Sequence, residues 1–171
     1  MKNKFYFFLT CALIIWSLSV PQTCLVLSDQ LTSEGYFLAL VKDKEEFSLA
    51  WRHSVELQPW EETFRVNLKN QEFVLVETRF RAYGAGVPNV SPGRYALENG
   101  FIVYKNLNQP YTSLPFYLSH YALYHLKIGN QDYNLSLLVP DNTKVSLSLQ
   151  KLSRGAYFWS ALKLYWKKML A

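Results

Sequence analysis

Apolar and polar residues alternate with a period of two along most of this chain, and no other feature limits its fold as strongly. The alternation begins near Glu34 and is clearest in the tracts 46–56 and 61–69. Successive side chains of a β-strand point to opposite faces, so this period gives each strand one apolar and one polar face. An amphipathic helix would need a period near 3.6. The chain is therefore expected to form sheets that bury one face.

The pattern predicts about eight strands. Their ranges are 36–42, 46–56, 61–69, 72–82, 101–105, 121–128, 131–139 and 143–150. Turn residues separate several of them, at 69–71, 129–130 and 140–142. Aromatic residues, which favour half-buried strands, make up 16% of the chain. The sequence thus predicts an all-β domain, either an antiparallel β-sandwich or a barrel.

The N-terminal segment, residues 1–28, is different in kind. Two lysines precede an apolar run from Phe5 to Val20, which is the layout of a signal peptide. Counted on to Leu27, the run has 23 residues, enough for a hydrophobic helix that stays in the bilayer as a membrane anchor. Both alternatives place the rest of the chain outside the cytoplasm, either secreted or anchored to the outer face of the cytoplasmic membrane.

The C-terminal tail, residues 153–171, changes to helical spacing and leaves 29–152 as the β domain. Its apolar residues follow a helical stripe: Phe158, Ala161, Leu162, Tyr165, Trp166 and Met169. Ser160, Lys163 and Lys167 fall on the opposite side. A basic amphipathic helix with tryptophans is typical of membrane surfaces, but a helix that packs on the β domain or covers a sheet edge has similar spacing. Both alternatives stay open.

Composition argues against several classes of protein. The net charge is +5, and without Lys2 and Lys4 the remaining 16 basic and 13 acidic residues leave +3. This excess is too small to indicate a nucleic acid partner. The two cysteines, Cys11 and Cys24, both lie in the N-terminal segment, so the domain has neither a disulfide framework nor a cysteine nucleophile.

His53 and Glu62 are the strongest candidates for chemistry, because both are in phase with apolar residues. An ionisable group on a buried face is costly unless it is paired. If the strands on either side of a loop at 56–61 formed a hairpin, His53 would lie opposite Phe64 and diagonal to Glu62, about 7–8 Å away. Such a pair would suit a His–carboxylate hydrogen bond or half of a ligand site. A satisfied polar pair at the sheet margin is the structural alternative.

Other catalytic arrangements have less support. Ser54 directly follows His53, so the two side chains point to opposite faces, and no GxSxG motif is present. His120 and His125 have no acidic cluster nearby, so a zinc site is not expected. Neither a metal nor a cofactor is expected in this domain.

Three carboxylates form a further candidate, for a hard cation such as calcium: Glu56, Glu61 and Glu62. Oxygen ligands are the ones that calcium prefers. Exposed carboxylates of this kind more often belong to a solvated loop, so the sequence does not favour the calcium site.

The segment Tyr83-Gly84-Ala85-Gly86 is the second candidate site, at the end of the expected strand 72–82. Glycines there allow positive φ and expose backbone N–H groups, which could bind an anion or a carboxylate. The spacing does not match GxGxxG and no helix is expected to follow, so a dinucleotide site is not indicated. A plain turn is the alternative.

Several of these residues occur in a recognisable order. His53-Ser54-Val55-Glu56 comes first, then Pro59 and Glu62, then Gly84-Ala85-Gly86-Val87-Pro88. In this, residues 34–150 resemble a bacterial family known as domain of unknown function 1850, in which an HSVE-like motif, a proline and a glutamate, and a GAG-P loop follow one another. Family members look like small exported proteins, often encoded beside TRAP transporters whose solute-binding protein is of the TAXI type. The resemblance implies an accessory role at the cell envelope.

Three functions remain open. The first is an extracytoplasmic accessory or ligand-binding module, with a small molecule, TRAP-TAXI transporter components and the membrane as partners, and with no nucleic acid. Its expected site residues are His53, Ser54, Glu56, Glu62, Tyr83, Gly84 and Gly86. The second is an envelope enzyme that uses His53 and Glu62 as an acid–base pair. The third is a structural envelope protein.

Overall fold

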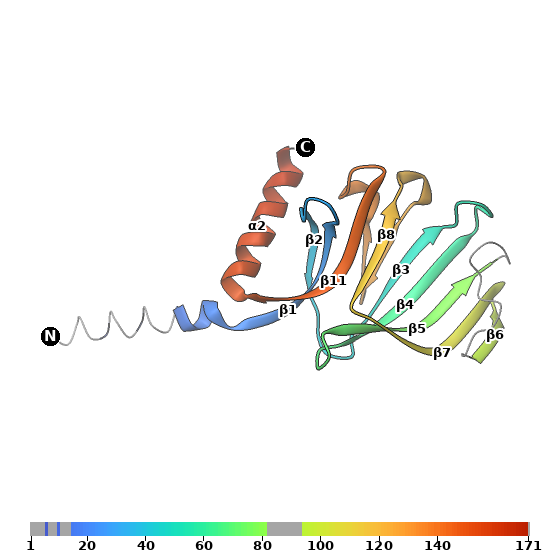
Figure 1. Cartoon of the computed structure of the whole chain (residues 1–171), viewed down its shortest axis with the longest axis horizontal. Helices are drawn as coiled ribbons and strands as arrows, with labels where there is room; N and C mark the ends of the chain where they lie inside the picture. Colours follow the sequence, from blue (N-terminus) through green and yellow to red (C-terminus); the bar gives the residue numbers. More distant parts are fainter. Residues whose placement is uncertain (1–5, 7–9, 11–14, 82–93, 171) are drawn as a thin grey trace.

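Two antiparallel sheets form the body of the molecule, in a computed structural model that describes Tyr6, Thr10, 15–81 and 94–170. One sheet has four strands in the order β2-β1-β11-β8, and the other has seven in the order β10-β9-β3-β4-β5-β7-β6. The arrangement is a sandwich in which the seven-stranded sheet extends beyond the smaller one, and its described strands do not close into a barrel (Figure 1).

The described elements have the following bounds. The four-stranded sheet consists of β1 (Pro21–Asp29), β2 (Gly35–Leu40), β8 (Ser113–Leu118) and β11 (Thr143–Ser153). The seven-stranded sheet consists of β3 (Glu46–Arg52), β4 (Pro59–Asn67), β5 (Glu72–Phe80), β6 (Arg94–Glu98), β7 (Phe101–Tyr111), β9 (His125–Ile128) and β10 (Gln131–Asn134). The helices are the short 3-10 helices η1 (His120–Ala122) and η2 (Leu135–Leu137) and the C-terminal α2 (Arg154–Leu170).

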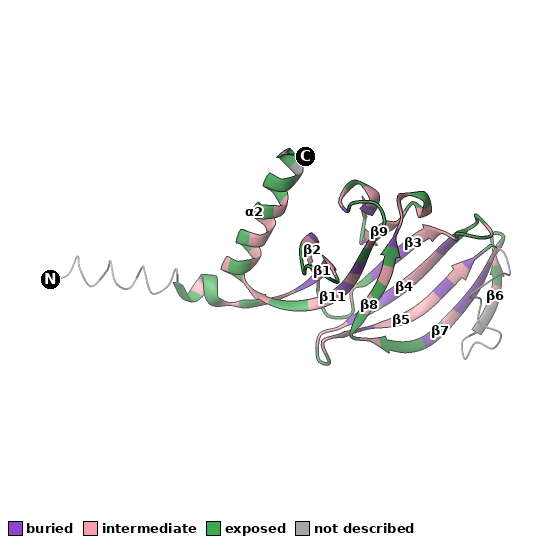
Figure 2. Cartoon of the chain, turned by 45° about the horizontal axis from the view of Figure 1, so that its top comes forward, coloured by how far each residue is buried: buried purple, intermediate pink, exposed green. Residues whose placement is uncertain are grey.

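The core lies between the two sheets, where the buried residues in Figure 2 follow the strands. Phe47 of β3 and Phe64 of β4 stack with their ring centroids 5.3 Å apart, and Phe73 of β5 meets both edge-on. From the smaller sheet, Leu25 and Leu27 complete the same cluster. Burial of each such side chain contributes about 2–3 kcal/mol to folding, so this cluster holds the sheets together.

The all-β prediction is confirmed, but the expected number of strands was too low. The described residues form eleven strands, and the three missed ones are β1, β6 and β8. β6 lies in a tract rich in Gly and Pro, and β8 contains Pro115, so both carry residues that disfavour strands. The expected strands 121–128 and 131–139 are shorter than predicted, because each includes a 3-10 helix.

β1 moves the expected boundary at residue 28. Its residues from Cys24 to Leu27 are all buried, because the strand is covered on both faces. Leu25 and Leu27 join the core, whereas Val26 lines a groove beneath α2. A strand covered on both faces is a continuous apolar run, which periodicity does not separate from the end of a hydrophobic segment. Residues 21–28 therefore belong to the β domain.

Helical residues 15–19 precede β1. The signal peptide or membrane anchor remains a prediction for the part of the chain before Pro21. Among the described residues, no helix combines the length and the apolar character that crossing a bilayer requires.

α2 confirms the expected C-terminal helix. It lies on the outer face of the four-stranded sheet, where it contacts β1, β2 and β11 (Figure 1). The seven-stranded sheet carries no helix of comparable length among the described residues, so the two outer surfaces of the sandwich differ.

Candidate functional site

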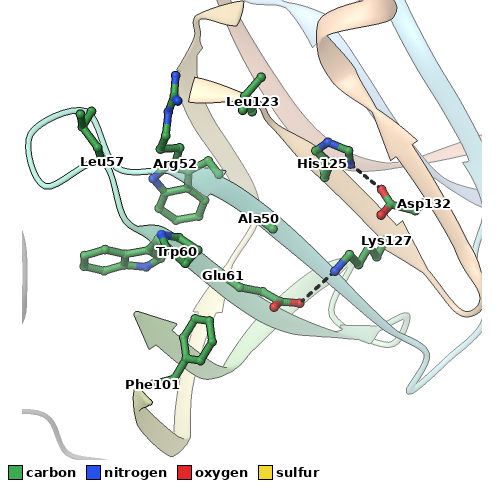
Figure 3. Close-up of a pocket in the computed structure, with 12 residues that line it drawn as sticks. Ala50, Arg52, Leu57, Trp60, Glu61, Phe101, Leu123, His125, Lys127 and Asp132 are labelled. Carbon is green, nitrogen blue, oxygen red and sulfur yellow. Dashed lines mark hydrogen bonds and ion pairs between the residues drawn. The ribbon is translucent and has the colours of Figure 1, made fainter. Parts of the chain in front are cut away.

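A groove of about 450 Å³ opens on the outer face of the seven-stranded sheet, beside the hairpin that joins β3 to β4 (Figure 3). Its volume lies in the range of sites that hold a small ligand. Twelve residues line it: Ala50, Trp51, Arg52, Leu57, Pro59, Trp60, Glu61, Phe101, Leu123, His125, Lys127 and Asp132.

The floor of the groove follows from strand pairing. Ala50 of β3 lies directly between Glu61 of β4 and His125 of β9, so three side chains in one row point outward. Because the central residue of this row has only a methyl group, the two longer neighbours stand as walls on either side of a depression. Figure 3 shows Ala50 at the centre, with Glu61 and His125 on opposite sides.

The charged side chains of the floor pair with one another. Glu61 Oε1 accepts a hydrogen bond from Ser48 Oγ at 2.8 Å and lies 4.0 Å from Lys127 Nζ. His125 Nδ1 lies 2.8 Å from Asp132 Oδ1. These ion pairs are partly exposed and contribute little to stability, so a ligand can replace them at small cost.

One guanidinium group, that of Arg52, lines the groove, and two more lie over the lining residue Phe101. Arg52 Nη2 donates to the carbonyl oxygen of Tyr121, and its guanidinium lies 4.2 Å from the centroid of that ring. Arg79 and Arg81 lie over Phe101, a groove residue, at 4.5 and 4.6 Å. Nε of Arg52 and Nε of Arg79 are buried and have no hydrogen-bond partner among the described residues. Each is a donor that a ligand oxygen could satisfy.

The HSVE motif forms the turn between β3 and β4, beside the groove. His53 N donates to the carbonyl oxygen of Gln58 at 2.9 Å, and Leu57 N donates to that of His53 at 3.0 Å, which closes the turn. The His53 ring pairs with Glu56 and stacks on Trp60, with ring centroids 5.6 Å apart. His53 and Glu56 thus support two groove residues, Leu57 and Trp60, and neither lines the groove itself.

The expected contact between His53 and Glu62 is not formed. Glu62 lies opposite Leu49, and Trp60 lies opposite Trp51, so the β3–β4 register differs by six residues from the predicted one. β3 ends at Arg52 and the turn begins at once, which shortens the hairpin. Glu62 is four residues from the end of the turn at Gln58, or about 13 Å along the strand. Trp60 lies in the same row of side chains between the two groups.

Glu62 instead points into the space between the sheets. Burial raises its pKa to about 7, and a hydrogen bond from Trp60 opposes this shift to a smaller extent. Tyr111 and Tyr124 lie near Glu62. Burial raises the pKa of both phenols, and the negative charge of Glu62 raises it further. Glu61 and Glu62 therefore serve opposite faces of the same strand, and only Glu61 belongs to the groove.

The remaining predicted site residues have different outcomes. Ser54 lies exposed in the turn. Tyr83, Gly84 and Gly86 lie outside the described residues. Within the described ranges, no three His, Cys, Asp or Glu side chains gather as a metal site, and the carboxylates at 56, 61 and 62 point in different directions.

Sequence reasoning missed most of the groove. Arg52, Glu61 and Lys127 occupy the polar face of alternating strands, where a solvated surface is the usual interpretation. Their signal appears only once β9 is known to pair with β3, because this pairing joins strands that are far apart in the sequence.

Comparison with known proteins gives one match. A family model described as a domain of unknown function, DUF1850, matches residues 47–135. No curated protein and no solved structure gives a significant match. All twelve groove residues lie between Ala50 and Asp132, inside the matched segment, whereas α2 lies outside it.

Proposed function

The chain belongs to the DUF1850 family, and on this premise we propose that it is an extracytoplasmic binding module that holds a small organic anion in the groove beside the 53–58 hairpin. The observation that carries the proposal is Arg52, whose guanidinium lines the groove and whose Nε has no hydrogen-bond partner among the described residues. A buried donor without a partner costs free energy, and a carboxylate would satisfy it.

The charge around the groove favours an anion. Among the lining residues, Arg52 and Lys127 match the charges of Glu61 and Asp132, and the further basic groups of Arg79 and Arg81 lie over the lining residue Phe101. Guanidinium forks bind carboxylates in two-pronged geometry. Phe101 adds a flat apolar wall on which a ring or a short apolar body can lie, whereas the Trp60 ring is largely buried against Phe80. The ligand class is therefore an organic acid with an apolar part.

An association with a TRAP transporter of the TAXI type is part of the proposal and rests on the family resemblance. A module that binds an organic acid outside the membrane could capture a transported solute or regulate the solute-binding protein. Co-purification of the intact chain from its own envelope tests this part. Recovery of transporter subunits supports it, and recovery of the chain without them contradicts it.

The acid–base alternative lacks its pair, because Trp60 lies between His53 and Glu62. The binding function therefore has better geometric support than the enzyme.

The binding proposal is tested with benzoate and its uncharged counterpart benzamide, added to the full chain while tryptophan fluorescence is recorded. We expect benzoate to bind at least ten times more tightly. Arg52→Gln should weaken benzoate binding about thirtyfold, or about 2 kcal/mol, because it removes a charged donor. Arg65→Gln is the matched control, since Arg65 is an exposed arginine on β4 of the same sheet that pairs with Glu46 and does not line the groove. Equal binding of the two compounds would contradict the proposal.

A further inference from the structure

α2 turns its most apolar side away from the protein. Its outer stripe consists of Phe158, Trp159, Tyr165, Trp166 and Met169, which are between 54% and 67% exposed. At about 100° per residue, these five positions lie within roughly 120° of one another. Half-buried residues of α2 are Gly155, Tyr157, Ser160, Ala161, Leu162 and Leu164, and all but Gly155 and Leu162 lie outside the sector of the outer stripe. A helix that only covers a sheet would have the opposite arrangement, with its apolar side inward.

Positive charge flanks the outer stripe. Residues 151–170 contain five lysines and arginines and no acidic residue. Lys163 lies over the Trp159 ring at 5.8 Å, so a basic group and an aromatic one share the same surface. Tryptophan and tyrosine combine an apolar ring with a polar atom, which suits the boundary between headgroups and acyl chains. This composition fits anionic headgroups above an apolar layer.

The outer stripe begins where the apolar N-terminal run ends. Arg154 N, at the start of α2, donates to the carbonyl oxygen of Val20 at 3.0 Å. Leu18 lies close to Gly155: a Cβ atom added at Gly155 would be 3.7 Å from the Cβ of Leu18. Ile15 and Trp16 are 65% and 70% exposed. The described end of the N-terminal run, residues 15–20, therefore lies beside the start of α2, at the end of the molecule away from β6 and β7 (Figures 1 and 2).

We infer that the outer stripe of α2 lies in the headgroup region of an anionic lipid bilayer, together with the exposed side chains of Ile15 and Trp16. The bilayer contact would hold the four-stranded sheet near the membrane and leave the seven-stranded sheet further away. This inference concerns how the domain is mounted, and it does not depend on the ligand proposed for the groove.

The test uses the full chain reconstituted in vesicles of phosphatidylcholine and phosphatidylglycerol, with brominated acyl chains as fluorescence quenchers. Trp159 and Trp166 should contribute at least half of the quenched signal. The double variant Trp159→Phe/Trp166→Phe keeps the apolar surface but should lose that contribution, while Trp16 remains. Equal quenching of the wild type and the double variant would overturn the inference, since the two tryptophans would then lie in water or against another protein.

A charge variant separates lipid contact from a folding effect. Phe158→Glu should reduce the quenching of Trp159 and Trp166 at least threefold, because a carboxylate is repelled by phosphatidylglycerol and is costly to bury. Leu137→Glu is the matched control, because Leu137 is 77% exposed and belongs to η2, outside the outer stripe, and should leave the quenching unchanged. Thermal unfolding should agree between the two variants. A concentration-dependent dimer that needs Phe158, without quenching by lipid, would show that a second copy covers the stripe and would overturn the inference.

Discussion

The two outer surfaces of the sandwich differ in the side chains that they expose. On the seven-stranded sheet, charged and aromatic side chains surround a groove, and every residue that lines it falls in the segment that matches the family. On the four-stranded sheet, α2 presents five exposed apolar side chains and lies outside that segment. We interpret the first surface as the binding site and the second as the means of attachment. Changes to one surface should then leave the other intact.

The largest expected effect comes from a substitution in the core, which should destabilise both sheets together. Phe64 is completely buried between the sheets and packs against Phe47 and Phe73. Phe64→Ala should lower the free energy of unfolding by about 3–5 kcal/mol, because it removes a large side chain and leaves a cavity. Urea unfolding followed by circular dichroism measures the change. A loss below about 1 kcal/mol would show that the sheets do not depend on a shared core.

Glu62 lies between the two surfaces and links stability to pH. Its pKa is raised by burial from 4.5 to about 7, so the folded state holds a proton that the unfolded state releases between these values. The contribution of Glu62 to stability is therefore greatest below pH 4.5 and falls as pH rises to about 7, by about 2–3 kcal/mol. Glu62→Gln should remove this loss. The variant and the wild type should unfold alike at pH 4 and differ at pH 8, and equal stability at both values would contradict the buried position.

The sequence contained the fold class but only part of the site. A period of two was sufficient for the strands from Gly35 to Phe80, in which apolar and polar side chains alternate. It failed at β1, which is buried on both faces, and it did not fix the β3–β4 register. A register shift of six residues, an even number, leaves every side chain on the same face of the sheet. The alternation of apolar and polar residues therefore cannot distinguish the two registers. His53 and Glu62 were thus placed on the correct face with the wrong neighbours.

Substitutions of His53 test whether its ring only supports Trp60 or also contacts the ligand. The ring stacks on Trp60, which lines the groove, and it pairs with Glu56, which does not. His53→Ala should lower stability by about 1–2 kcal/mol and weaken benzoate binding about fivefold, because the indole loses its backing. His53→Phe keeps a ring on Trp60 and should restore most of the binding. If His53→Phe binds as poorly as His53→Ala, the imidazole itself contacts the ligand.

The smallest effects are expected on the outer stripe of α2. Trp166 is 54% exposed and lies on the side of the helix that faces away from the sheet. Trp166→Ser should change the free energy of unfolding by less than about 0.5 kcal/mol, as surface substitutions usually do. It should also leave benzoate binding unchanged, because the groove lies on the other sheet. Urea unfolding and the fluorescence titration measure these two quantities on the same sample. A clear loss of benzoate affinity would show that the two surfaces are coupled through the core, and the division into a binding surface and an attachment surface would then be wrong.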